Sequence, residues 1–350
     1  MLDFIKIFLP TTLAFLIGIA ITPLATSYMY RFKLWKKSAR AGDDKPAIFN
    51  QIHNTDEEIR TPRVGGVIIW GSVVIAMGVL FVIAYLIPSP LSSKLEFVSR
   101  NQTLIPLAAL VLGSLLGLVD DLLQVFNIGS YSRDHIQYRR VKVIAVILIG
   151  LMLGSWFYFK LGMTGITVPF FGMISLGYLF IPFFIMVLLA TFSTSVIDGI
   201  DGLAGGVLAV VFAAYTGIAF FNNQIDIAAF SGVITGATLA FLWFNVPPAR
   251  FYMGETGMLG LTVVLTVIAF LTDSVLVLPI IALPLVATSL SVIIQISYYK
   301  ATGGKRLFKL SPLHHHFEAL GWSRPKITMR YWIVSIISAI IGIIITVIGI

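Results

Sequence analysis

The sequence is dominated by long apolar runs. A helix that crosses a membrane needs roughly 20 mostly apolar residues, and it must satisfy its own backbone because lipid offers no hydrogen-bond partners. Only 11% of the residues are charged and 58% are hydrophobic, whereas soluble proteins carry about 25% charged residues. We therefore predict an all-α integral membrane protein, with residues 1–350 forming one polytopic domain of about ten transmembrane helices. The predicted spans are 4–28, 64–88, 103–119, 141–160, 175–196, 203–221, 227–245, 256–272, 274–298 and 330–349.

The lysines and arginines indicate how these spans are oriented. If the chain crosses the membrane ten times, 20 of the 24 Lys and Arg residues fall on one side. Cytoplasmic loops carry an excess of positive charge, so we expect that side to face the cytoplasm and both termini to lie on the other. The net charge of +8 follows from this arrangement, and no nucleic-acid partner is needed to explain it. There is no cysteine, which excludes disulfides and thiolate metal sites.

Two adjacent carboxylates lie at the end of the third predicted span. Asp120 and Asp121 occur in GLVDDLLQV, and we expect their charge to end the helix. Neighbouring carboxylates repel each other, so they require a cation, a proton or separate roles. One could bind a divalent metal while the other accepts a proton. The alternative is a solvated helix end, but charge beside a bilayer is costly, which favours a functional site.

A Gly-rich acidic segment, VIDGIDGLAGG at 196–206, joins the fifth and sixth spans. Asp198 and Asp201 are three residues apart and would share one face of a helical turn. Gly199, beside Ile200, permits close backbone approach, and a Gly-rich turn at a helix N-terminus can meet a nucleotide. A tight membrane turn is the alternative, although such a turn does not need two aspartates.

The segment FNVPPARFYMGETG at 244–257 joins the seventh and eighth spans. Asn245 can offer a donor and an acceptor to a base, and Tyr252 offers a stacking face. Glu255 could complete a Mg²⁺ site, because Mg²⁺ favours one or two protein carboxylates plus substrate phosphates. Alternatively, Glu255 is a charge placed against the helix dipole. The middle parts of the spans are almost free of ionisable residues, which disfavours an ion-coupled transporter.

Three consecutive histidines occur in SPLHHHFEALGW at 311–322. A helix would spread His314, His315 and His316 around its circumference, so separate roles are more plausible than one metal site with three histidine ligands. Zinc is disfavoured because no HExxH pattern is present. Lys142, in RRVK before the fourth span, could anchor the helix at the membrane surface or contact a diphosphate.

Taken in order, these motifs resemble the bacterial polyprenyl-phosphate N-acetylhexosamine-1-phosphate transferases. TPRVGG resembles the family's TPxxGG, VDDLL its VDD, DGIDGLAGG its DGLDGLA, and FNVPPARFYMGETG its FNxxPAxxFMGDxG. PLHHHFEALGW resembles PxHHHFExxGW, which is most specific to the muramoyl branch of the family. The resemblance covers essentially the whole chain.

The resemblance implies a reaction as well as a location in the bacterial cytoplasmic membrane. A muramoyl-branch enzyme moves phospho-MurNAc-pentapeptide from UDP-MurNAc-pentapeptide to undecaprenyl phosphate with Mg²⁺ as cofactor, which releases UMP and gives the first lipid-linked peptidoglycan precursor. Many family members are homodimers. The other open alternatives are a UDP-GlcNAc-type donor, a catalytically impaired homologue that only binds ligand, and a transporter.

The resemblance also implies roles for individual residues. Asp120 or Asp121 would deprotonate or orient the lipid phosphate, and Glu255 would bind the metal, with Asp121 as the second candidate ligand. The uridine pocket would involve Asp198, Gly199, Ile200, Asp201, Asn245 and Tyr252. The three histidines, His314, His315 and His316, would lie near the donor diphosphate, and so would Lys142. His314 is the catalytic candidate among the histidines.

The chain departs from the family pattern at several positions. The family lysine before the TP motif is missing, with Glu58 near its position, and Ile200 for leucine and Tyr252 for phenylalanine are mild changes. Phe192 and Ser195 stand where the family has asparagines, and Glu255 stands where it has aspartate.

Overall fold

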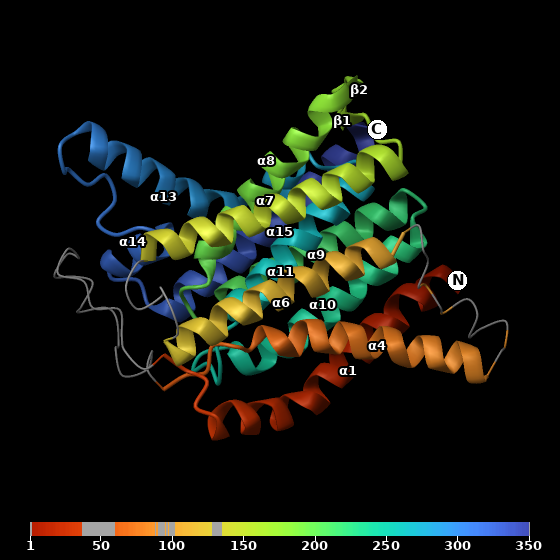
Figure 1. Ribbon diagram of the computed structural model, residues 1–350, viewed down its shortest axis with the longest axis horizontal. Coiled ribbons are helices and arrows are strands. Elements are labelled where there is room, and N and C mark those ends of the chain that lie inside the picture. Colours follow the sequence, from red (N-terminus) through yellow and green to blue (C-terminus); the bar gives the residue numbers. More distant parts are fainter. Residues whose placement is uncertain are drawn as a thin grey trace.

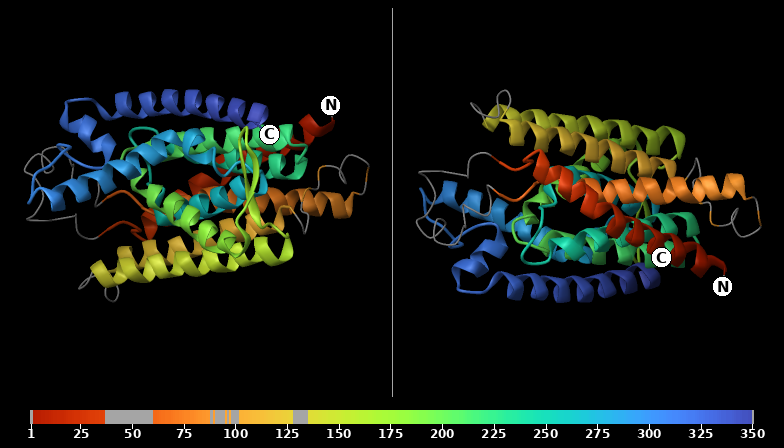
Figure 2. Two further views of the ribbon diagram at one scale, coloured as in Figure 1. Left: turned by 90° about the horizontal axis from the view of Figure 1, so that it is seen from above. Right: turned by 90° about the horizontal axis from the view of Figure 1, so that it is seen from below.

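The computed structural model describes residues 2–36, 60–87, 102–127 and 135–349, together with 89, 95 and 97. Long helices run roughly side by side along one axis, and both termini lie at the same end of the bundle (Figures 1 and 2). The site described below lies toward the opposite end. Several of the lysines and arginines used to predict orientation fall within 37–59, outside the described residues.

Nine helices in the described part of the chain are long and apolar enough to cross a membrane. This confirms the predicted all-α membrane fold. The helices that contain these spans are α1 (Leu2–Arg31), α4 (Gly66–Leu86), α6 (Leu104–Phe126), α7 (His135–Lys160), α8 (Phe180–Ser193, followed by the 3₁₀ turn η3, Thr194–Ile197), α9 (Leu203–Phe221), α10 (Ile225–Asn245), α11 (Gly254–Leu271) and α15 (Arg324–Gly349).

The predicted span 274–298 is not one continuous helix. It forms α12 (Leu278–Ile281) and α13 (Leu283–Ala301), which meet at the non-helical residue Ala282. Pro279 and Pro284 lie at the starts of these two helices, and proline inside a helix removes a hydrogen bond and clashes with the preceding turn. Neither α12 nor α13 is among the nine helices long and apolar enough to cross a membrane in the described part of the chain, so a tenth pass stays a prediction.

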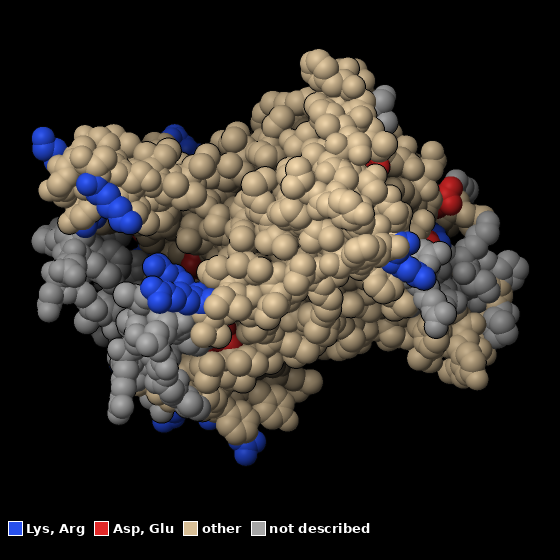
Figure 3. Space-filling model, turned by 45° about the horizontal axis from the view of Figure 1, so that its top comes forward, with Lys and Arg blue, Asp and Glu red and all other residues tan. Residues whose placement is uncertain are grey.

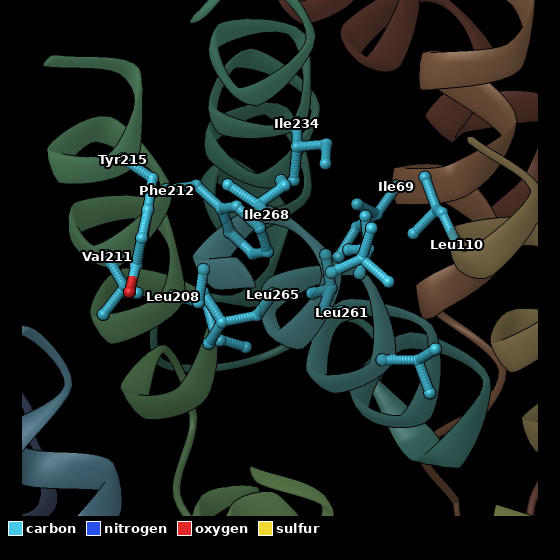
Figure 4. Close-up of a cluster of buried hydrophobic side chains, with 14 of the residues drawn as sticks. Ile69, Leu110, Leu208, Val211, Phe212, Tyr215, Ile234, Leu261, Leu265 and Ile268 are labelled. Carbon is cyan, nitrogen blue, oxygen red and sulfur yellow. The ribbon is translucent and has the colours of Figure 1, made fainter. Parts of the chain in front are cut away.

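Helix α11 forms the centre of the bundle. In its most apolar window 89% of the residues are buried, against 22% in α1 and 28% in α15, so the outer helices leave their apolar faces to lipid. Residues from α4, α6, α9, α10 and α11 meet in the apolar cluster drawn in Figure 4. In the view of Figure 3 the middle of the surface is free of charged side chains, and Lys and Arg gather toward the two ends.

The predicted end of the third span was wrong. Helix α6 does not end at Asp120 but continues to Phe126, because the two aspartates point into the protein and find partners there. A β-hairpin that was not predicted is formed by β1 (Gly165–Val168) and β2 (Gly172–Ser175), which pair antiparallel. The hairpin lies beside the C-terminus, away from the site (Figure 1). The remaining short elements are η2 (Gly177–Leu179) and α14 (Leu313–Ala319).

Candidate active site

A lysine joins two carboxylates from different helices. Lys142 Nζ, near the start of α7, donates to Asp120 Oδ2 at 3.0 Å and to Glu255 Oε1 at 2.8 Å. Gln124, one helical turn beyond Asp120, donates to the same Asp120 oxygen at 3.0 Å. The Lys142 and Asp120 side chains are only 16% and 4% exposed. The predicted residues Asp120, Lys142 and Glu255 are thus brought together from α6, α7 and α11.

The N-terminus of α11 is capped from outside the helix. Its N-cap position, Met253, has no side chain able to accept a hydrogen bond, and the first amides of any helix need acceptors. Asp121 supplies them through both oxygens, accepting from Glu255 N at 3.1 Å and Thr256 N at 2.8 Å. Asp198 accepts from Gly254 N at 3.1 Å. Both carboxylates also complement the positive end of the helix dipole.

The contact between α6 and α11 depends on glycine. A Cβ at Gly117 would overlap the backbone of Glu255, so only glycine lets α6 approach closely enough for Asp121 to reach the α11 amides. Gly254 has a φ of +70°, a conformation that favours glycine. A side chain there would also meet the carbonyl of Arg63.

The segment between η3 and α9 is a turn and not part of a helix. Asp198 and Asp201 therefore do not share a helical face, which corrects the prediction, but both accept hydrogen bonds from the segment after α10. Asp201 Oδ2 accepts from Ala249 N at 3.0 Å. Burial raises the pKa of Asp198 to about 6, although the charge of Arg63 and the Gly254 hydrogen bond oppose this rise.

Asn245 connects the turn to the same segment. Its Oδ1 accepts from Gly202 N at 3.0 Å and its Nδ2 donates to Phe251 O at 2.8 Å. The residue is 4% exposed. Both polar groups are therefore used within the chain, and a contact with a base remains a prediction that would require one of these bonds to change. Tyr252 is partly exposed, and its backbone pairs with Pro62 and Gly65.

Two of the three histidines face the turn. An added Cβ at Gly199 would lie 2.5 Å from His314 Nε2 and 3.2 Å from His315 Nε2. His314 is fully buried, as is most of the neighbouring Ile200. His316 points elsewhere, accepting from Lys309 N at 3.1 Å through Nδ1. The structure thus separates His316 from the predicted pair.

A carboxylate behind the histidines was not among the predicted site residues. Glu318 Oε2 forms a hydrogen bond with His315 Nδ1, and Glu318 Oε1 accepts one from Arg324 Nε at 2.8 Å. Burial alone would raise the pKa of Glu318, but the hydrogen bonds from His315 and Arg324 outweigh it and lower the pKa below its usual value. The three-residue spacing of His315 and Glu318 on α14 was the available signal.

Glu255 has one oxygen that suits a cation. Among the described residues no group of three or more His, Asp or Glu side chains is arranged as a ready metal site. Glu255 Oε2, however, is buried and has no hydrogen-bond partner there, whereas Asp121 directs both oxygens at amides. These residues fit a cation that takes few protein ligands and keeps water or substrate phosphate in its shell, as Mg²⁺ does.

An apolar cavity of about 420 Å³ opens between α8, α11, α12 and α13. Its few polar side chains include Ser193 and Ser289, whose hydroxyls are 2.7 Å apart. Phe192 precedes Ser193, and its ring centroid is 6.0 Å from Lys142 Nζ.

Comparison with known proteins agrees with this geometry. Residues 103–273, which include Asp120, Lys142 and Glu255, match the family described as glycosyl transferase family 4. A phospho-N-acetylmuramoyl-pentapeptide-transferase from Thermoanaerobacter sp. is 36% identical over 336 residues, covering 95% of this chain and 96% of the relative. Proteins of the same name from Caldanaerobacter subterraneus and Bacillus velezensis are 37% identical over 271 residues (76% of this chain, 81% of the relative) and 32% identical over 336 residues (95% of each). Since two of these relatives match 95% of the chain at 36% and 32% identity, the chain belongs to the phospho-N-acetylmuramoyl-pentapeptide-transferase family.

Proposed function

We propose that this protein transfers phospho-N-acetylmuramoyl-pentapeptide from its UDP-linked donor to undecaprenyl phosphate, releasing UMP, at the cytoplasmic face of the bacterial cytoplasmic membrane. The observation that carries the proposal is the lysine bridge between Asp120 and Glu255, with the His314–His315 pair and the Asp198 turn gathered at the same end of the bundle. The excess of Lys and Arg in the loops at this end supports the cytoplasmic orientation. We also propose a homodimer, on family grounds alone, and native mass spectrometry tests it.

The apolar cavity suits the acceptor lipid. Its lining residues, such as Phe183 and Ile293, are almost all apolar, while Ser193 and Ser289 add hydroxyls. A polyprenyl chain in the cavity would place its phosphate near these hydroxyls and Lys142. An oxygen of that phosphate attacks the sugar-bearing phosphorus, and the bond from this phosphorus to the UMP oxygen breaks.

Lys142 and the histidines would stabilise the negative charge of the donor diphosphate. Phosphoryl transfer depends mainly on positioning and on stabilising charge on the transferred group. The Lys142 ammonium can leave Asp120 and bind the donor diphosphate. The Asp120 carboxylate is then available to orient the lipid phosphate or accept its proton. His315, held by Glu318, is fixed for a contact with the diphosphate. Asp121 acts through Glu255, whose backbone it holds.

We propose Mg²⁺ as the cofactor, held by Glu255 through Oε2. The metal supplies charge neutralisation for the diphosphate and the leaving UMP. The Glu255 side chain is longer than that of aspartate by one methylene. Because Asp121 fixes the Glu255 backbone, the position of the carboxylate depends on the side-chain torsion angles of Glu255.

The test is UMP release by purified protein in detergent with undecaprenyl phosphate and MgCl₂. One reaction contains UDP-MurNAc-pentapeptide and a second contains UDP-GlcNAc. We expect release from the muramoyl donor only. Release from UDP-GlcNAc alone would assign the chain to a related sugar donor. Binding of UMP without release from either donor, in folded protein, would instead indicate a catalytically impaired homologue.

A further inference from the structure

The Lys142 ammonium occupies the space between two carboxylates that would otherwise repel each other. It contacts one oxygen of Asp120 at 3.0 Å and one oxygen of Glu255 at 2.8 Å. The Glu255 side chain is 24% exposed and that of Asp120 is 4% exposed. Attraction between such charges is strong because little water screens them. The pair is thus already joined by a cation before any ligand binds.

A divalent cation would seek the same place. Mg²⁺ binds carboxylate oxygens at about 2.0–2.1 Å, so it and an ammonium cannot both lie between Asp120 and Glu255. Glu255 Oε2 is the oxygen that Lys142 does not use, and it is buried without a hydrogen-bond partner. A cation can therefore approach Glu255 at Oε2 while Lys142 still holds Oε1, but it can bridge to Asp120 only after the ammonium leaves.

The bridging ammonium already lies at the outer limit of a cation–π contact with the Phe192 ring, and on leaving the carboxylates it can approach the same ring more closely. The ring of Phe192, at the end of α8, has its centroid 6.0 Å from Lys142 Nζ, within the range of a cation–π interaction. Ser193, the next residue along the chain, lines the apolar cavity. A lysine released from the carboxylates would remain beside the Phe192 ring.

We propose that Lys142 is a built-in competitor of the divalent cation: it holds Asp120 and Glu255 together in the metal-free protein, and metal binding releases it toward Phe192 and the phosphates. The inference rests on the proposed metal-dependent transfer. It predicts that the intact lysine weakens metal binding in the absence of substrate.

The experiment measures Mn²⁺ binding, without donor or lipid, by electron paramagnetic resonance of the free ion in detergent. Lys142→Met keeps the apolar stem and removes the charge, and it should bind Mn²⁺ at least about tenfold more tightly than the natural protein, since one nearby unit charge is removed. Lys326→Met is the matched control, because Lys326 also lies over an aromatic ring, that of Trp322. The control should bind Mn²⁺ as the natural protein does.

A second variant keeps the inference testable if Lys142→Met does not fold. Phe192→Leu removes the ring but leaves the lysine, so the ammonium should stay on the carboxylates and Mn²⁺ binding should weaken by about threefold or more. Unchanged or weaker binding in Lys142→Met, or unchanged or tighter binding in Phe192→Leu, overturns the inference. If the inference is overturned but the natural protein releases UMP, the proposed function still stands. If the Mn²⁺ shifts are as expected but no UMP is released, the proposed function is refuted and the inference about Lys142 stands.

Discussion

Asp121→Asn should loosen the N-terminus of α11. The carboxylate accepts from Glu255 N and Thr256 N, one through each oxygen. Asparagine keeps one acceptor oxygen, but its amide group would face the other N–H as a second donor. Asp121 is 1% exposed, so water cannot readily replace the lost acceptor.

The cost can be worked from these contacts. A buried donor left without a partner costs about 1–3 kcal/mol. Loss of the negative charge at the helix N-terminus adds about 0.3–1 kcal/mol, and more where the site is partly buried. We therefore expect opening of the first turn of α11 to become easier by about 2 kcal/mol, or roughly 30-fold. Turnover should fall as well, since the Glu255 backbone is no longer held.

Amide hydrogen exchange of the peptide containing Glu255 and Thr256 checks this expectation, together with thermal unfolding in detergent and UMP release. Asp120→Asn is the matched control, because the neighbouring carboxylate accepts hydrogen bonds from the side chains of Lys142 and Gln124, whereas Asp121 accepts from the α11 amides. It should leave exchange at α11 unchanged. If Asp121→Asn abolishes turnover while exchange at α11 stays within twofold of the natural protein, the residue acts in chemistry and the capping argument fails.

Three further changes test the packing and the histidine pair. Gly66→Ala should lower the unfolding temperature or prevent folding, because its Cβ would overlap the backbone of Gly257, whereas Gly78→Ala on the same helix meets nothing within 4 Å and should be neutral or slightly stabilising in the same assay. Gly199→Ala should reduce UMP release about tenfold or more with little change in unfolding temperature, because its Cβ displaces an imidazole 2.5 Å away and small misplacements are costly; unchanged kinetics would refute a role for this pair. Glu318 has a pKa below the usual 4.5, so its stabilising contribution is present above that pH and is lost as the pH falls through the lower, folded-state value. Glu318→Gln should lack this acid-side loss in unfolding scans between pH 3 and 6, and an identical acid limb in both proteins would contradict the assignment.

The sequence predicted the helices well where apolar runs decide the structure. The span predicted at 203–221 has the same bounds as α9. Prediction was wrong at Asp120, where charge was expected to end the helix, because whether a charge ends a helix depends on what faces it. Here Lys142 faces Asp120, and the α11 amides face Asp121. Those amides belong to residues 134 and 135 positions after Asp121 in the sequence. No local pattern contains that information.

The candidate site was predicted as a set of residues but not as a set of partners. In the structure Lys142, Asp120 and Glu255 lie together, and His314 and His315 face the Gly199 turn, a contact that was not predicted. Separate roles were expected for the three histidines, but which of them lies away from the turn depends on how the loop before α14 is placed. Asp121 stays a predicted second metal ligand, and its hydrogen bonds to the amides of another helix were not predicted.

The hydrogen-bond partners divide the five carboxylates that the sequence analysis named into two groups, according to how easily each can change its partners. Asp121, Asp198 and Asp201 accept hydrogen bonds from backbone amides, and these amides cannot move without unwinding a helix end or a loop. Asp120 and Glu255 share a side-chain ammonium, which can leave by rotation about the bonds of its own stem. A reaction that binds and releases a diphosphate in each cycle requires groups of the second kind. We therefore propose Asp120 and Glu255 as the carboxylates that take part in chemistry, with the other three keeping the helix ends and loops around them in position.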